Sequence, residues 1–157
     1  MEIVKFEDRY SQGVIELWNQ ACQSEMPYKP FTKESFTKTF LNNPEFDYNG
    51  TFVALEDEKV IGFANGIYRK KLLPGETFEK EPGYITFVLV DNAYRGKGIG
   101  TLLLDNIELF LKNRGKNCIY ILFFNPISLS WYIPDTDGHD HPDSPGVDLG
   151  SSAFTFL

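Results

Sequence analysis

Apolar residues recur along the chain with two different periods, and these periods predict five strands and three helices. Strands are predicted at residues 2–7, 51–56, 60–68, 84–90 and 118–124, and helices from residue 11 or 12 to about 24, after Thr32, and from Ile99 to about Gly115. Segments 51–56 and 60–68 are close enough in sequence to form an antiparallel hairpin. Segments 84–90 and 118–124 flank a helix, and such a crossover favours parallel pairing. The pattern therefore predicts an α/β protein with a mixed sheet.

Three local patterns predict burial or exposure. Residues 118–124 are almost wholly apolar, which predicts a strand that is buried on both faces. Cys22 and Cys118 are too few for a disulfide framework, and both are expected to be reduced and buried. The basic run at residues 69–71 (Arg-Lys-Lys) is interpreted as a solvated turn.

Composition narrows the class of protein. A chain of 157 residues with 42% hydrophobic residues suits one globular domain. The formal charge of −7 argues against a nucleic-acid-binding protein and is compatible with a cationic or amine substrate. The sequence shows no signal peptide and no apolar run of membrane-spanning length. A cytoplasmic protein without a membrane partner is therefore expected.

The stretch from residue 84 to residue 111 carries the strongest chemical signal. An apolar strand at 84–90 leads into a turn with glycines at positions 96, 98 and 100, and a helix begins at Ile99. The first amides of a helix lack intrahelical partners and carry partial positive charge, and glycines let a phosphate approach them closely. Arg95 and Lys97 add cationic charge at the same place. A tight strand-to-helix connection is the alternative interpretation, but the combined features favour a phosphate site.

The segment from Val88 to Leu103 resembles the acetyl-coenzyme A signature of the GNAT N-acetyltransferases. That family carries Arg/Gln-x-x-Gly-x-Gly/Ala, which Arg95, Gly98 and Gly100 match. A Walker loop is absent, and the Rossmann fingerprint fails because the residue three after Gly98 is Thr101. The resemblance covers residues 2 to about 125. It implies a GNAT-like three-layer fold with a mixed, mostly antiparallel sheet, whose fourth and fifth strands splay apart around the pantetheine arm.

The resemblance also implies roles for particular residues. The donor, acetyl-CoA, is expected to bind at Val88, Leu89, Val90, Arg95, Gly96, Lys97, Gly98, Ile99, Gly100, Thr101 and Asn125. The acceptor is expected to contact Met26, Tyr28 and Phe31 in the loop between the first two helices. The alternative is that these three side chains simply pack as a lid on the core.

These features predict an N-acetyltransferase that transfers the acetyl group of acetyl-CoA to a primary amine of a small molecule or peptide. An ammonium must lose a proton before it attacks, so a general base is needed. Glu81 and Glu79 precede the central strand and are the nearest acidic candidates. The resemblance places Tyr84 where some relatives carry a catalytic Glu, so it does not itself identify the base. Tyr132 is the candidate acid for the leaving thiolate. A non-catalytic domain that binds coenzyme A or a partner chain is the alternative.

The C-terminal part fits the resemblance least well. Residues 126–149 form an atypical loop rich in Pro, Asp and Gly within a single predicted domain, 1–157. Two interpretations are open: the chain is truncated and is one part of a longer protein, or it is complete with an unusual ending. A homodimer and a missing C-terminal domain are also both open. His139, Asp140 and His141 could share a metal, but a structural loop is the favoured interpretation, and no metal site is predicted.

Overall fold

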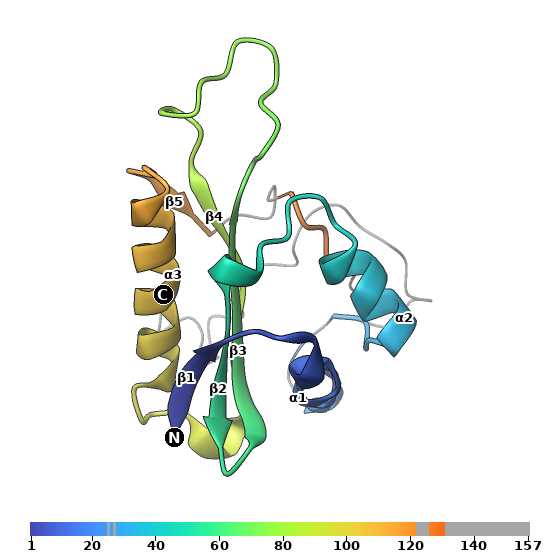
Figure 1. Ribbon diagram of the computed structural model, residues 1–157. Coiled ribbons are helices and arrows are strands. Elements are labelled where there is room, and N and C mark those ends of the chain that lie inside the picture. The colour runs from blue at the N-terminus through green and yellow to red at the C-terminus, as the bar shows by residue number, and fades with distance from the viewer. Residues whose placement is uncertain (25, 27, 122–125, 131–157) are drawn as a thin grey trace.

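The computed structural model describes residues 1–24, 26, 28–121 and 126–130, and a sheet lies at its centre (Figure 1). The strands of the described part are β1 (Glu2–Lys5), β2 (Thr51–Glu56), β3 (Lys59–Tyr68), β4 (Gly83–Val90) and β5 (Ile119–Tyr120). Their order in the sheet is the order along the chain. β1 to β4 pair antiparallel, whereas β5 runs parallel to β4. The predicted hairpin, crossover and mixed, mostly antiparallel sheet are confirmed.

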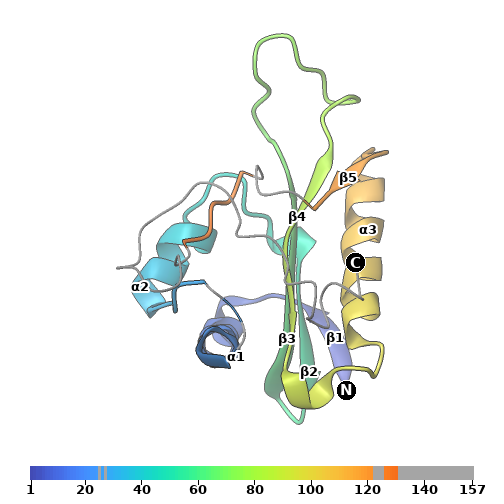
Figure 2. The same cartoon turned by 180° about the vertical axis from the view of Figure 1, so that it is seen from behind.

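Helices cover both faces of this sheet, which gives the three predicted layers (Figures 1 and 2). The α-helices of the described part are α1 (Ser11–Ser24), α2 (Lys33–Phe36) and α3 (Ile99–Asn113), and the other helical segments are η1 (Asp8–Tyr10), η2 (Thr37–Leu41), η3 (Tyr48–Gly50) and η4 (Asn92–Tyr94). α1 and α2 lie on one face and α3 on the other. None of the helices in the described part of the chain has the length and apolar character needed to cross a bilayer.

Each face of the sheet has its own apolar core. The first cluster, on the α1 side, contains Trp18, Phe63 and Leu89, and the second cluster, on the α3 side, contains Leu103 and Ile107. α1 and α3 each bury residues three or four positions apart, as the sequence pattern predicts. The core therefore lies on both sides of β3 and β4, and these two strands are held from both faces.

Helix ends follow from local chemistry. Thr32 Oγ1 accepts the Ser35 N–H at 3.1 Å, and Ser35 Oγ accepts the Thr32 N–H at 2.9 Å, which is a capping box at the start of α2. α3 is followed by Gly115 with φ of +76°, and this left-handed residue ends the helix as predicted. The boundaries of α1 and α3 agree with the sequence analysis.

A β-bulge interrupts the pairing of β3 with β4. Asn65 lies opposite Phe87 and Gly66 lies opposite Ile85, so Thr86 is the extra residue on β4. The bulge also changes which face the side chains reach: Ile85 belongs to the second cluster, but Phe87, two residues later, belongs to the first. Bulges bend a strand and re-aim its side chains, and they are frequent beside functional sites.

The expectation that residues 118–124 are buried on both faces is wrong for the described part of this segment. Tyr120 and Ile121 are 44% and 51% exposed. Among the described strands, β5 is the last in the sheet order, and an apolar run cannot distinguish an edge strand from a central one. Both cysteines are free thiols, but Cys118 is exposed and Cys22 only half-buried, so their predicted burial is also wrong.

Candidate functional site

The turn between β4 and α3 presents its backbone to open space. Gly96 and Gly98 have φ of +73° and +79°, a region that side chains of L-residues disfavour. A Cβ atom added at either glycine would meet no other atom within 4 Å. The turn therefore has both the conformation and the free volume for close approach of a ligand.

Amide groups at the start of α3 face the same turn. Leu102 donates its N–H to Gly98 O at 3.0 Å, so the amides of Ile99, Gly100 and Thr101 precede this helical hydrogen bond. Gly98 is the N-cap residue and supplies no side-chain cap. Since the helix dipole adds partial positive charge here, an anionic phosphate fits this place. We call Gly96 to Thr101 the cradle.

Two basic side chains border the cradle in different ways. Lys97 is exposed, and its Nζ lies 4.9 Å from the ring centre of Tyr94. Arg95 donates from Nε to Val90 O at 2.9 Å, which anchors its guanidinium at the end of β4. Lys97 is thus the more accessible charge for a phosphate, and Arg95 also joins the turn to the strand.

Asp91 fixes the junction between β4 and this turn. Its carboxylate is buried and accepts the Ala93 N–H at 3.0 Å and the Lys59 Nζ at 3.1 Å. Its own N–H donates to Ile61 O at 2.8 Å. Burial opposes ionisation, but the Ala93 amide and the Lys59 ammonium outweigh it and hold the pKa of Asp91 below its ordinary value. The direction of the chain into the cradle is therefore set by one buried carboxylate.

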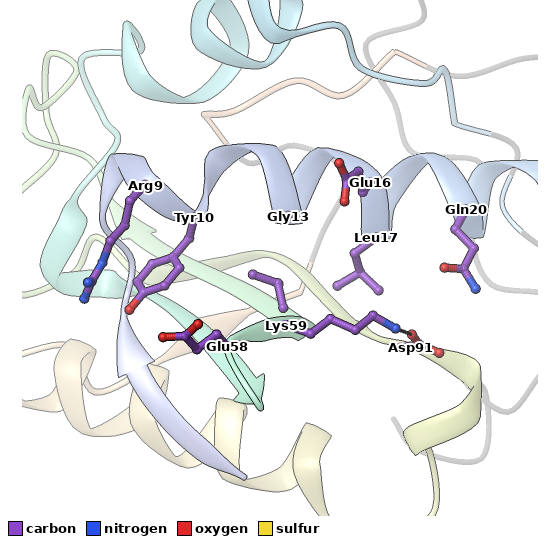
Figure 3. Close-up of a pocket in the computed structure, with 10 residues that line it drawn as sticks. Arg9, Tyr10, Gly13, Glu16, Leu17, Gln20, Glu58, Lys59 and Asp91 are labelled. Carbon is purple, nitrogen blue, oxygen red and sulfur yellow. Dashed lines mark hydrogen bonds and ion pairs between the residues drawn. The ribbon is translucent and has the colours of Figure 1, made fainter.

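A cavity of about 270 Å³ lies beside this junction (Figure 3). It is lined by α1, by the β2–β3 turn and by Asp91, and the Lys59 side chain runs along it toward Asp91. The cradle residues do not line it. We therefore assign this cavity to the support of the junction and not to the predicted donor site.

Replacement of Asp91 tests this support. Asp91→Ala should lower the free energy of unfolding at pH 7 by about 1–3 kcal/mol, because it removes a turn cap and an ion pair. Asp91→Asn keeps an oxygen for Ala93 and should cost less. Because the folded pKa is depressed, the carboxylate stabilises the fold above its ordinary pKa of 3.8, and this contribution disappears as the pH falls through the folded pKa. Urea unfolding at neutral and acidic pH measures the difference; a pH-independent gap between wild type and Asp91→Asn would contradict the assignment.

Next to the cradle, β4 has no strand partner among the described residues on the side away from β3. In the described part of the chain, β5 pairs with β4 only at Gly83–Ile119 and Tyr84–Tyr120. Asp91 N–H points toward β3, so the Val90 carbonyl points away from β3, and strand alternation gives Val88 the same direction. The side chains of Leu89 and Ile99, in contrast, are buried in the core. Only the backbone of Ile99 is therefore available to a ligand, whereas the backbone of Leu89 points toward β3.

The predicted acceptor loop packs against β4. The Trp18 ring lies 4.5 Å from Phe87, 5.5 Å from Tyr28 and 4.9 Å from Phe31, between ring centres. Trp18 Nε1 donates to Lys29 O at 3.0 Å, and Lys29 N–H donates to Ser130 O at 2.9 Å. Tyr28, Phe31 and Met26 are partly buried on the first cluster. These side chains therefore form part of the core surface beside β4, where they can also meet an acceptor.

Glu81 lies in a buried polar network before β4. Its Oε1 accepts the Tyr84 hydroxyl at 2.8 Å and lies 3.4 Å from Arg69 Nε. Burial and the Glu81 carboxylate raise the pKa of Tyr84 to about 12. Lys116 Nζ donates to Glu81 O at 3.0 Å.

Glu79, the other acidic candidate, is exposed. Arg69 is paired, so the interpretation of residues 69–71 as a solvated turn is wrong for Arg69.

Several predicted residues lie outside the described part of the chain. These are Asn125, Tyr132 and the His139-Asp140-His141 loop. Three features were missed by sequence reasoning: the Asp91–Lys59 ion pair, the bulge at Thr86 and the Trp18–Lys29 hydrogen bond. The one available signal was the Asp91-x-Ala93 spacing, since an Asp side chain often accepts the amide two residues later.

Known proteins share this architecture. The model of the acetyltransferase (GNAT) family matches residues 14–132. N-alpha-acetyltransferase 30 of Schizosaccharomyces pombe is 29% identical over 113 residues, which are 72% of this chain. The chain spans 66% of the length of that relative.

Solved structures agree in fold. Aminoglycoside 6'-N-acetyltransferase AAC(6')-IG from Acinetobacter haemolyticus has a TM-score of 0.56 at 17% identity, over 76% of this chain and 77% of that chain. Ribosomal-protein-alanine N-acetyltransferase from Brucella melitensis biovar Abortus 2308 has the same TM-score at 18% identity, over the same shares. AAC(6')-Iy, solved in complex with CoA, has a TM-score of 0.58 at 16% identity, over 76% and 74%. With the strand, the glycine turn and the helix in place, this chain belongs to the GNAT acetyltransferase family.

Proposed function

We propose that this protein is an N-acetyltransferase that transfers the acetyl group of acetyl-CoA to a primary amine. The observation that carries the proposal is the open cradle, where left-handed glycines and the first amides of α3 follow directly from β4. The two glycines leave room that any Cβ would fill, so the residues present fit a pyrophosphate.

Particular groups would hold the donor. The amides of residues 98–101 would bind the pyrophosphate, and Lys97 would add charge. Backbone groups of Val88 and Val90 face the side of β4 away from β3, where they would pair with the amides of the pantetheine arm as a neighbouring strand would. Arg95 already occupies the Val90 carbonyl with one donor, so its main contribution is to hold this edge in place. Asn125 remains a predicted contact.

When bound, acetyl-CoA supplies an acetyl thioester that a neutral amine can attack. The protein must then remove a proton from the acceptor and stabilise negative charge on the carbonyl oxygen. A backbone amide near Val90 would donate a hydrogen bond to that oxygen. Tyr132 remains the predicted proton donor to the thiolate.

Glu81 is the proposed proton acceptor, and Tyr84 links it to the first cluster. The carboxylate is buried, accepts the Tyr84 hydroxyl and lies beside the Arg69 guanidinium. We therefore place the amine proton on the Tyr84 oxygen as the Tyr84 proton passes to Glu81. Tyr84 belongs to the first cluster, against which Tyr28 and Phe31, the proposed acceptor residues, also pack.

The acceptor is a small molecule or a peptide. The relatives include an aminoglycoside 6'-N-acetyltransferase, an N-alpha-acetyltransferase and a ribosomal-protein-alanine N-acetyltransferase. The formal charge of −7 favours cationic acceptors. A cytoplasmic location and a homodimer, or a further C-terminal domain, also remain predictions.

Ligand binding and turnover test the proposal together. Acetyl-CoA and CoA should each raise the melting temperature of the protein, and an amine panel of aminoglycosides, polyamines and peptides should release free CoA thiol from acetyl-CoA. Absence of a melting shift at millimolar acetyl-CoA would contradict donor binding. Binding without turnover on any amine would favour the non-catalytic alternative.

A further inference from the structure

Lys116 is a buried cation that the proposed mechanism does not use. Among the described residues it is the only basic residue that is buried, with 5% of its surface exposed, and it makes no ion pair there. Its Nζ donates to Phe78 O and to Glu81 O, both at 3.0 Å, and lies 5.5 Å from the ring centre of Tyr68. A buried charge is costly unless it is hydrogen-bonded, so this ammonium is committed to the two carbonyls.

The carbonyls that Lys116 binds belong to the turn that carries Glu81. The Glu81 N–H donates to Thr77 O at 2.9 Å and closes this turn. The last carbonyls of a turn have no partner within it, and Lys116 supplies a donor to two of them. The Glu81 carboxylate is held separately, by Tyr84 and Arg69. Lys116 therefore holds the backbone of the residue whose side chain the proposed mechanism uses.

The backbone of Lys116 is itself fixed to the end of α3. The Lys116 N–H donates to Leu111 O at 3.1 Å and the Gly115 N–H donates to Lys112 O at 2.9 Å, which is the Schellman motif that ends this helix. α3 begins at the cradle and runs alongside the sheet to this point (Figure 1). Its length is about 22 Å at 1.5 Å per residue. One rigid helix thus joins the cradle at one end to the Glu81 turn at the other.

We propose that Lys116 is a positioning residue for Glu81, the proposed base. This inference rests on the proposed function. The ammonium holds the Glu81 turn against the C-terminal end of α3, and the helix thereby fixes the base relative to the cradle. Within the described part of the chain, Nζ hydrogen-bonds to backbone carbonyls and to neither the Glu81 carboxylate nor the Tyr84 hydroxyl. Lys116 forms and breaks no bond during acetyl transfer and acts only through Glu81.

A double-variant cycle tests whether Lys116 acts through Glu81. Lys116→Met keeps an unbranched side chain and removes the ammonium. It should lower kcat about 10–100-fold on the acceptor that the amine panel identifies, because a misplaced catalytic group costs this much, and leave the dissociation constant of acetyl-CoA unchanged. Lys116→Met combined with Glu81→Gln should be no slower than Glu81→Gln alone. A further loss in the double variant, or an unchanged kcat in Lys116→Met, would overturn the proposal. If the wild-type protein turns over no amine, the proposed function fails instead.

Hydrogen exchange tests the same contact without an acceptor. The Lys80 and Glu81 amides both donate to Thr77 O, and Lys116→Met should speed their exchange about tenfold, as expected for the loss of a charge-assisted hydrogen bond. Lys112→Met is the matched control, because Lys112 is an exposed lysine in the last turn of α3. It should leave both amides and kcat unchanged. Unchanged exchange in Lys116→Met, or equal acceleration in Lys112→Met, would overturn the proposal.

Discussion

Gly98→Glu should abolish the stabilisation of this protein by acetyl-CoA. In the wild type, acetyl-CoA at 100 times its dissociation constant should add about 2.7 kcal/mol, or about 5–11 °C in melting temperature. Gly98 caps α3 in a left-handed conformation with open space above it, so a glutamate there places bulk and negative charge where the phosphate would lie. The shift should therefore fall to zero in thermal unfolding with and without ligand.

Gly75→Glu is the control for this variant. Gly75 also has a positive φ, +91°, and open space around it, but it lies in the loop between β3 and β4. Both variants therefore introduce the same side chain at a strained backbone position, and only one lies in the cradle. Gly75→Glu should lose some stability and keep the full acetyl-CoA shift. A shift retained by Gly98→Glu, or lost equally by both variants, would contradict the donor site.

Glu81→Gln should lower the rate of acetyl transfer by about 10²–10⁴-fold on any acceptor that the amine panel identifies. The substitution keeps the size of the side chain and an oxygen for the Tyr84 hydroxyl, but it removes the charge that accepts the proton. Glu81 is distant from the cradle along β4, so the dissociation constant of acetyl-CoA should not change. Steady-state rates with a thiol-detection assay, combined with calorimetry, separate the two effects.

Glu76→Gln provides the comparison for Glu81. Glu76 lies 3.5 Å from the same Arg69 guanidinium but has no described contact with Tyr84. If Glu81 acted only by holding Arg69, the two variants would lower the rate alike. A small effect of Glu76→Gln beside a large effect of Glu81→Gln would assign the loss to proton transfer. An unchanged rate for Glu81→Gln would remove Glu81 from the mechanism.

Features that depend on neighbours in sequence could be predicted closely. β2, α1 and the start of α3 follow from hydrophobic period, from turn residues and from the glycine spacing, all of which act over a few residues. The cradle belongs to this class, because Gly96, Gly98 and the helix amides are adjacent along the chain. The phosphate-binding part of the proposed donor site can therefore be predicted from the sequence of one short segment.

Features that depend on distant partners could not be predicted. The apolar run at 84–90 gives no sign of the bulge at Thr86, because every residue suits a buried strand and the register is set by β3. The Lys59–Asp91 pair joins residues 32 positions apart. The place of β5 at the end of the described sheet likewise depends on the order of the other strands. The Glu81 network forms only when Arg69, which follows β3, lies close to Tyr84 in β4. The sequence composition does not predict this proximity.

The agreement between strand order in the sheet and strand order in the chain has a consequence for folding kinetics. β2, β3 and β4 are consecutive and antiparallel, so their pairing closes comparatively short loops. Parallel pairing of β5 must wait for α3 to cross the sheet, which makes it a slower, less local step. The cradle lies where these two stages meet. A folding intermediate that contained only the β2–β4 meander would carry β4 but not the phosphate site, and acetyl-CoA would then select for molecules in which the α3 crossover is complete.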